Sequence, residues 1–113
     1  MRIFLGWKHC RYGVGGFTLI QTHRGGGLIP CDIYKDGTEE EIEEVAKKLF
    51  FPNGINVSQN VLLAETTYFL GSFSGSHLPK LLENGDPFNL QGYCADLHTN
   101  PVRVYLHTIE VCT

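Results

Sequence analysis

The sequence predicts an α+β fold, in which one main helix packs across a mixed sheet of four to five strands. Three observations lead to this prediction: two strand-like segments near the start, one capped amphipathic helix after them, and a long alternating strand pattern near the end. A chain of 113 residues has room for one domain of ordinary size and not for two. We therefore expect a single domain over residues 1–113.

The strand candidates are rich in β-branched and aromatic residues, and Gly-rich turns separate the early ones. The clearest pattern comes last, where Val102, Val104 and Leu106 alternate with more polar neighbours. Such a strand suits the middle of a sheet, beside the first strand. Pro30 lacks an N–H group, so its segment belongs at an edge, a bulge or a strand start. The candidates are residues 1–10, 17–23, 28–34, 66–73 and 102–111.

The helix has a start signal, an apolar face and a stop signal. Thr38 and Glu41 form a Thr-x-x-Glu capping box, and acidic residues fill the first turn, where the helix dipole favours them. Pro52 and the Asn-Gly pair after it end the helix. We predict a helix over about residues 38–51. Its apolar face consists of Ile42, Val45, Ala46, Leu49 and Phe50.

Composition and charge exclude several classes of protein. Hydrophobic residues make up 42% of the chain and charged residues 19%, which excludes intrinsic disorder. The formal net charge of −3 argues against a nucleic-acid partner or an anionic membrane surface. No apolar run approaches the roughly 18 residues of a membrane span. The first ten residues read as a strand rather than a signal peptide, so we expect a cytoplasmic or nuclear location.

No pattern in the sequence indicates a cofactor, a metal site or an enzyme. The glycine runs at 13–16 and 25–27 lack the features of phosphate-binding and dinucleotide-binding loops, so tight turns explain them. The histidines and cysteines lack the spacing of metal ligands. We expect Cys10, Cys31, Cys94 and Cys112 to be free thiols. The alternative is a small enzyme or a thiol/histidine site that uses Cys10, Cys31 or Cys94.

The order of elements resembles the ubiquitin-like β-grasp superfamily. The resemblance lies in the opening strand over residues 1–5, the Gly-rich hairpin, the helix that starts at Thr38-Glu39, and the closing strand over residues 102–109. The chain also resembles modules found with HECT-type ubiquitin ligases. That second likeness rests on Gly6-Trp7, on the glycines at 25–27, and on the Leu-Phe-Phe-Pro-Asn-Gly run at residues 49–54.

The resemblance implies a non-catalytic protein–protein interaction module in a signalling or ubiquitin-pathway scaffold. PB1, DIX and Ras-association domains are interaction modules of this superfamily. A ubiquitin-like modifier is the disfavoured alternative, because the printed sequence ends Val111-Cys112-Thr113 rather than Gly-Gly. The partner is then a protein, and a second copy of this chain is one option.

Two sets of charged residues suggest where partners bind. The basic set lies in or beside the first hairpin, and strand alternation puts Lys8 on the same side as Arg2. The acidic set lies on the helix, away from its apolar face, where a purely solvated face is the alternative. Pairing of a basic with an acidic surface, as in PB1-type modules, would join one molecule to the next. The sets are Lys8, Arg11 and Arg24, and Glu39, Glu40, Glu43 and Glu44.

Two aromatic residues have an open assignment. Trp7 and Phe51 are either core residues or aromatic anchors for a partner.

Overall fold

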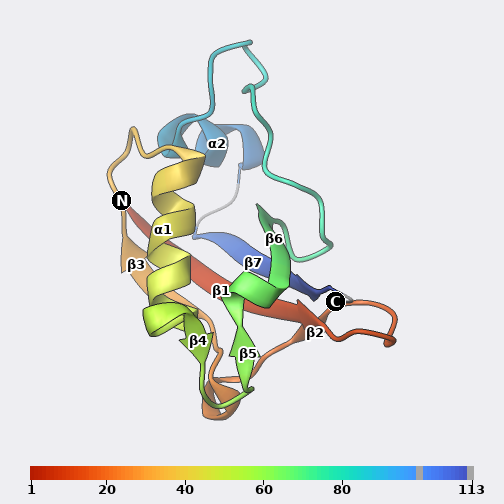
Figure 1. Cartoon of the computed structure of the whole chain (residues 1–113). Helices are drawn as coiled ribbons and strands as arrows, with labels where there is room; N and C mark the ends of the chain where they lie inside the picture. The colour runs from red at the N-terminus through yellow and green to blue at the C-terminus, as the bar shows by residue number, and fades with distance from the viewer. Residues whose placement is uncertain (99–100, 112–113) are drawn as a thin grey trace.

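The computed structural model describes residues 1–98 and 101–111 and contains a five-stranded mixed sheet crossed by a helix (Figure 1). At the centre, β1 (Arg2–Cys10) runs parallel to β7 (Val102–Glu110). The other edge of β1 carries β2 (Thr18–Leu19) and β3 (Ile29–Asp32), both antiparallel to it. On the far side, β6 (Thr66–Gly71) is antiparallel to β7. The predicted α+β class is confirmed, and so is the place of the last strand beside the first.

The register of the two central strands sorts their side chains onto two faces. Trp7 lies opposite Leu106, and His9 lies opposite Thr108, all on the face that the helix covers. The same register pairs Ile3 with Val102 and Leu5 with Val104 on this face, and all eight side chains of these four pairs are buried. Burial of this double row of side chains is the main source of the fold's stability.

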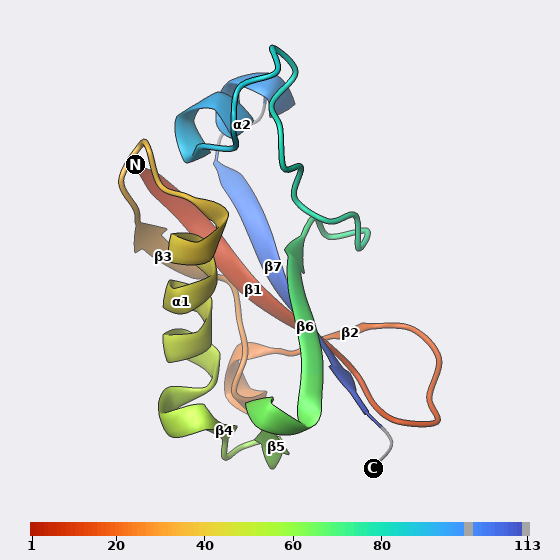
Figure 2. The same ribbon diagram turned by 45° about the horizontal axis from the view of Figure 1, so that its top comes forward.

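Helix α1 (Glu39–Phe50) lies across the sheet and contacts β1, β6 and β7 (Figure 2). Its N-cap is the predicted one, because the Thr38 hydroxyl accepts a 3.2 Å hydrogen bond from the Glu41 N–H. The helix buries Ile42, Ala46 and Phe50. Leu49, which the sequence pattern assigns to the same face, is exposed at its margin.

The remaining elements are short, and they frame the sheet. A small hairpin, β4 (Ile55–Asn56) and β5 (Val61–Leu62), follows the helix. A second helix, α2 (Leu90–Leu97), is capped by Asn89, whose side-chain oxygen accepts from the Gly92 N–H. Single 3-10 turns are η1 (Thr22–Arg24), η2 (Pro52–Gly54) and η3 (Leu63–Glu65). No helix of the described residues has both the length and the apolar character needed to cross a membrane.

The second strand is much shorter than the pattern at residues 17–23 predicts. Only Thr18 and Leu19 pair with β1, and the chain then leaves the edge in η1 before it returns as β3. Pro30 lies in β3, at the edge of the sheet, which is one of the three places its missing N–H group allows.

Two residues on the more polar side of β7 are buried as well, although Arg103 on the same side is exposed. Tyr105 and His107 are both buried, because aromatic side chains cover this second face of the sheet. Phe73 packs edge-on against Tyr105, and Phe69 stacks on His107 with ring centroids 4.7 Å apart. The structure therefore has apolar packing on both sides of its central strand.

The glycine run at residues 25–27 is a tight turn, as the sequence predicts. Gly25 and Gly27 have positive φ angles of +91° and +104°, which other residues rarely adopt. Gly26 lies so close to the main chain of Ile20 that an added Cβ would press on the Ile20 carbonyl. These contacts fold the segment between β2 and β3 against the end of β2.

We predict that Gly26→Ala lowers the free energy of unfolding by about 2 kcal/mol or more, because the methyl group meets backbone that cannot move aside. Gly15→Ala is the control, since nothing lies within 4 Å of its added Cβ and its φ angle is ordinary. Urea unfolding of both variants measures the difference. Equal stability of the two variants would show that the turn is not packed in this way.

Candidate functional site

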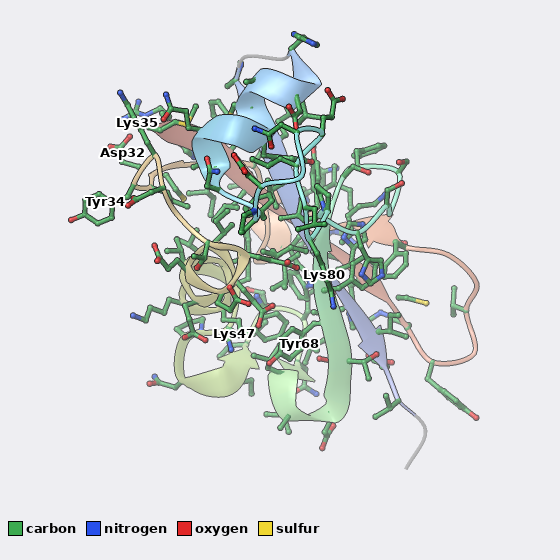
Figure 3. All side chains as sticks on the ribbon, turned by 90° about the horizontal axis from the view of Figure 1, so that it is seen from above. Asp32, Tyr34, Lys35, Lys47, Tyr68 and Lys80 are labelled. Atoms are coloured by element: carbon green, nitrogen blue, oxygen red, sulfur yellow. The ribbon has the colours of Figure 1, made fainter. Side chains whose placement is uncertain are left out.

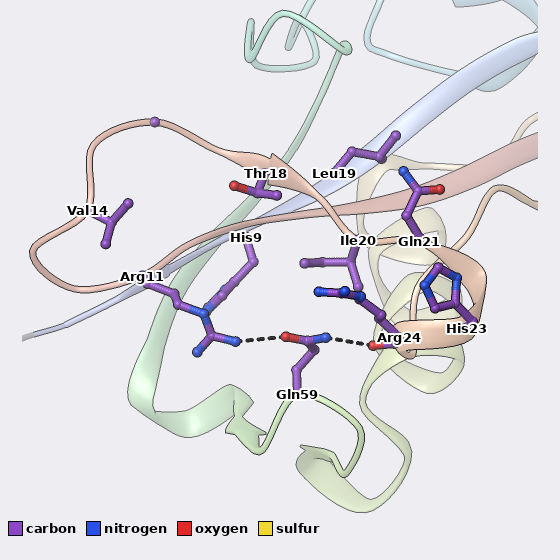
Figure 4. Close-up of a pocket in the computed structure, with 11 residues that line it drawn as sticks. His9, Arg11, Val14, Thr18, Leu19, Ile20, Gln21, His23, Arg24 and Gln59 are labelled. Atoms are coloured by element: carbon purple, nitrogen blue, oxygen red, sulfur yellow. Dashed lines mark hydrogen bonds between the residues drawn. The ribbon is translucent and has the colours of Figure 1, made fainter.

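Two of the three predicted basic residues meet at one cavity. Arg11 follows β1 and Arg24 ends η1, and both line a surface cavity of about 400 Å³ (Figure 4). In the figure, the Arg24 side chain extends from η1 across the cavity toward Arg11. Lys8 lies elsewhere. Its ammonium group is 4.1 Å from the centre of the Phe73 ring and donates a 2.7 Å hydrogen bond to the Phe73 carbonyl.

The cavity lies between the first hairpin, η1 and the β4–β5 hairpin. The segment through β2 contributes Thr18 and Gln21, η1 contributes His23, and the β4–β5 hairpin contributes Gln59. These polar residues belong to no sequence motif, so the sequence alone does not mark them as a site. The one sequence signal for this site is the Arg-Gly-Gly-Gly run, because a sharp turn at the glycines leaves the side chain of Arg24 exposed at the surface.

Gln59 fixes the two arginine segments relative to each other. Its Oε1 accepts a 2.7 Å hydrogen bond from Nη2 of Arg11, and its Nε2 donates a 2.9 Å bond to the Arg24 carbonyl (Figure 4). Asn56 anchors the same hairpin, because its side-chain amide donates to the carbonyls of Gly25 and Phe50 at 3.0 and 2.7 Å. Hydrogen bonds from side-chain amides therefore connect the walls of the cavity and restrict the movement of its loops.

The charge in the cavity is positive and only partly balanced. Arg11 lies 3.6 Å from a carboxylate oxygen of Glu110. The Arg24 guanidinium has no hydrogen bond or ion pair within residues 1–98 and 101–111. The backbone N–H of Tyr12, and next the side chains of His9 and Arg11, hold the pKa of the Glu110 carboxyl below its usual value. Glu110 is therefore ionised at neutral pH and offsets Arg11 but not Arg24.

A buried chain of hydrogen bonds supports one wall of the cavity. The indole N–H of Trp7 donates to Thr108 Oγ1 at 2.7 Å, and the same oxygen lies 2.7 Å from Nδ1 of His9. His9 Nε2 lies 3.0 Å from Glu110 Oε2. With a neutral imidazole, Thr108 donates to Nδ1 and Nε2–H donates to the carboxylate. Both ring nitrogens of His9 are thus used in hydrogen bonds within the protein. The ring therefore forms part of the cavity wall and has no free nitrogen to accept a proton from a ligand.

The two aromatic residues with an open assignment belong to the core. Trp7 is 0% exposed and Phe51 is 3% exposed, and their rings meet edge-on with centroids 5.0 Å apart. Of the two alternatives that the sequence leaves open, the structure favours the core, because neither side chain is exposed.

The predicted acidic residues lie together on the N-terminal half of α1, with Glu40 and Glu44 exposed and Glu39 and Glu43 partly buried. Lys47 offsets part of this charge, with its ammonium 2.7 Å from Glu44 and 3.9 Å from Glu43. Lys47 also lies beside the Tyr68 ring, 5.4 Å from its centre (Figure 3). Burial first, and then repulsion from Glu40 and Glu43, raises the pKa of Glu39. The negative charge of this face is therefore only partly neutralised by Lys47, and the face is suited to bind a basic surface.

Two of the cysteines are partly buried, and this burial makes their thiols less reactive. Burial raises the pKa of Cys31 and Cys94, which lowers their nucleophilicity at neutral pH. Cys10, Cys31 and Cys94 are free thiols, and their closest polar partners are backbone carbonyls and the Met1 sulfur. Cys112 lies outside the described residues. In that described part of the chain, no group of three or more metal-ligating side chains is placed to hold a metal ion.

The second face of the sheet holds a buried histidine between aromatic rings. Phe69 stacks on His107 on one side and on His77 on the other, and Phe17 meets His107 edge-on. His107 Nδ1 lies 3.1 Å from the Tyr105 carbonyl, which fixes it as the donor, and Nε2 has no hydrogen-bond partner among the described residues. Burial lowers the pKa of His107. The ring is therefore neutral in the folded protein at physiological pH.

Comparisons with known proteins leave the function to be argued from this geometry. The chain matches no protein-family model, no curated protein and no solved structure.

We predict that Thr108→Val lowers the free energy of unfolding by about 2–4 kcal/mol, because it leaves the Trp7 N–H and His9 Nδ1 buried without a partner. The matched control is Thr67→Val on β6, where the side chain is exposed and the change should be nearly neutral. Chemical denaturation measures both. A Thr108→Val protein as stable as the control would contradict the buried hydrogen-bond chain.

We predict that His107 makes the wild type lose stability as the pH falls below about 6.5, the ordinary histidine value. The depressed pKa means that the unfolded chain takes up the proton first, so acid favours unfolding until the folded pKa is passed. His107→Phe should remove this component of the pH profile, measured by urea unfolding between pH 5 and 8. Phe17→Leu, in the same cluster, should lower stability equally at every pH. An unchanged acid limb in His107→Phe would refute the assignment.

Proposed function

We propose that the chain is a ubiquitin-like β-grasp interaction module in a signalling or ubiquitin-pathway scaffold. The finer β-grasp assignment draws support from the topology. The first strand pairs antiparallel with the short strands at one edge of the sheet, one helix follows across the sheet, and the last strand lies parallel to the first at the centre. This is the arrangement that the resemblance of the sequence implies.

The charge distribution supports partner binding at two separate places. The acidic half of α1 lies at the end of the molecule that carries α2, and η1 with Arg24 lies at the opposite end, next to the β4–β5 hairpin (Figure 1). The observation that carries the proposal has two parts: the Arg24 guanidinium at one end has no ion pair within the described residues, and the carboxylates at the other end outnumber the lysine that pairs with them. Two complementary surfaces on one chain allow a second copy to be the partner.

The contact we propose is heterologous, with the acidic face of one copy against the Arg11–Arg24 end of the next. Different surfaces meet in such a contact, so it generates open chains unless the rotation closes a ring. Lys8 takes no part, because its ammonium group is held over Phe73 on the other face of the sheet. Charge pairing sets the specificity of such a contact more than its strength.

Light scattering from micromolar to near-millimolar protein should show a mass that grows with concentration and falls on addition of salt, which screens exposed charges. Arg24→Glu and Glu40→Lys should each abolish this growth, since both side chains are exposed. Mixing the two variants should restore a heavier species, because each retains the surface that the other has lost. The control is Arg103→Glu, which changes the same charge at an exposed position of β7 away from both surfaces.

A wild-type protein that stays monomeric at every concentration and salt level would contradict self-association. Equal effects of Arg103→Glu and Arg24→Glu would show a general response to net charge rather than a contact at these surfaces.

A further inference from the structure

We propose that the cavity between Arg11 and Arg24 is a binding site for a phosphate monoester group. The starting observation is that two guanidinium groups converge on one surface cavity while the described structure supplies a carboxylate to only one of them. Two like charges that face one cavity repel each other unless an anion lies between them. The cavity is therefore complementary to a group with more than one negative charge.

The side chains around the cavity fit a phosphate better than a carboxylate. A phosphate monoester carries about −1.5 to −2 charges near neutral pH and three acceptor oxygens. Guanidinium groups bind such oxygens in pairs, and Thr18, Gln21 and His23 line the same cavity with further possible donors. A single carboxylate would offset Arg24 and leave those donors unused.

The site is held ready by its surroundings. Gln59 orients the Arg11 guanidinium by a 2.7 Å hydrogen bond, and it ties the Arg24 main chain to the same hairpin. His9 forms a fixed wall, because Thr108 and Glu110 engage both of its ring nitrogens. An arginine that is already positioned loses less conformational freedom when the ligand binds.

The cavity is larger than a phosphate group alone. Its volume of about 400 Å³ lies within the usual range for small-molecule sites. A phosphate ester of a small molecule and a phosphorylated side chain of a protein partner share the chemistry that this site recognises. The body attached to the phosphate then occupies the remaining space, beside Val14 and Leu19.

Phosphate binding at this cavity does not depend on self-association of the chain. Because it is measured with dilute monomeric protein, the phosphate-site proposal and the self-association proposal can each fail without the other. If both hold, a phosphate ester competes with the acidic face of a second copy for Arg24, and its addition reduces the mass seen in light scattering.

Isothermal titration calorimetry of dilute protein with phenyl phosphate tests the proposal, with benzoate as the carboxylate control. Saturable binding of phenyl phosphate, at least about tenfold tighter than benzoate, is the expected result. Arg24→Gln and Arg11→Gln should each weaken it by about tenfold or more. Arg103→Gln should not, because that arginine lies away from the cavity. The thermal midpoint of Arg24→Gln should match the wild type, because no hydrogen bond or ion pair of the described residues is lost with its guanidinium.

Two further titrations identify the source of the phosphate. One uses ribose 5-phosphate and the other uses a short phosphoserine peptide with its unphosphorylated form, and the tighter binder indicates the natural class of ligand. The proposal is overturned if phenyl phosphate shows no saturable binding, if benzoate binds as well, or if Arg103→Gln weakens binding as much as Arg24→Gln does.

Discussion

The parallel pairing of β1 with β7 is the constraint on which the rest of the structure depends. It joins the two ends of the described chain over eight residue pairs, from Ile3 with Val102 to Cys10 with Ile109. Helix α1 covers one face of this pair, and the aromatic cluster around His107 covers the other. A buried hydrogen bond from Trp7 to Thr108 fixes the register, because a slip of one residue would leave both polar groups unpaired.

The same pairing positions the candidate site. The hydrogen-bond chain that starts at Trp7 continues through Thr108 and His9 to Glu110, and Glu110 faces Arg11 where the chain leaves β1. The cavity thus has one wall set by the core of the sheet and another set by the turn after β2. This arrangement explains how a surface site formed by short loops can have a defined shape.

Local signals made the main elements predictable from the sequence. The Thr38 cap and the spacing of Ile42, Ala46 and Phe50 define α1 without reference to any other part of the chain. Beyond the Arg-Gly-Gly-Gly run, the convergence of Arg11 and Arg24 has no local signal. It depends on Gln59, which accepts a hydrogen bond from Arg11 and donates one to the Arg24 carbonyl across the gap between two hairpins. Strand alternation assigns the even and odd positions of β1 to different faces of the sheet, but it does not show which other segments cover each face.

Burial on both faces of β7 was also hidden from the sequence, since the aromatic residues that cover His107 come from distant segments. Native-state hydrogen exchange followed by NMR tests the central pairing most directly. Amides that join β1 to β7 should be the slowest to exchange, with opening energies equal to the free energy of global unfolding. Amides in the turn at residues 11–17 should exchange far faster. Rapid exchange along either central strand, at rates similar to that turn, would contradict the account.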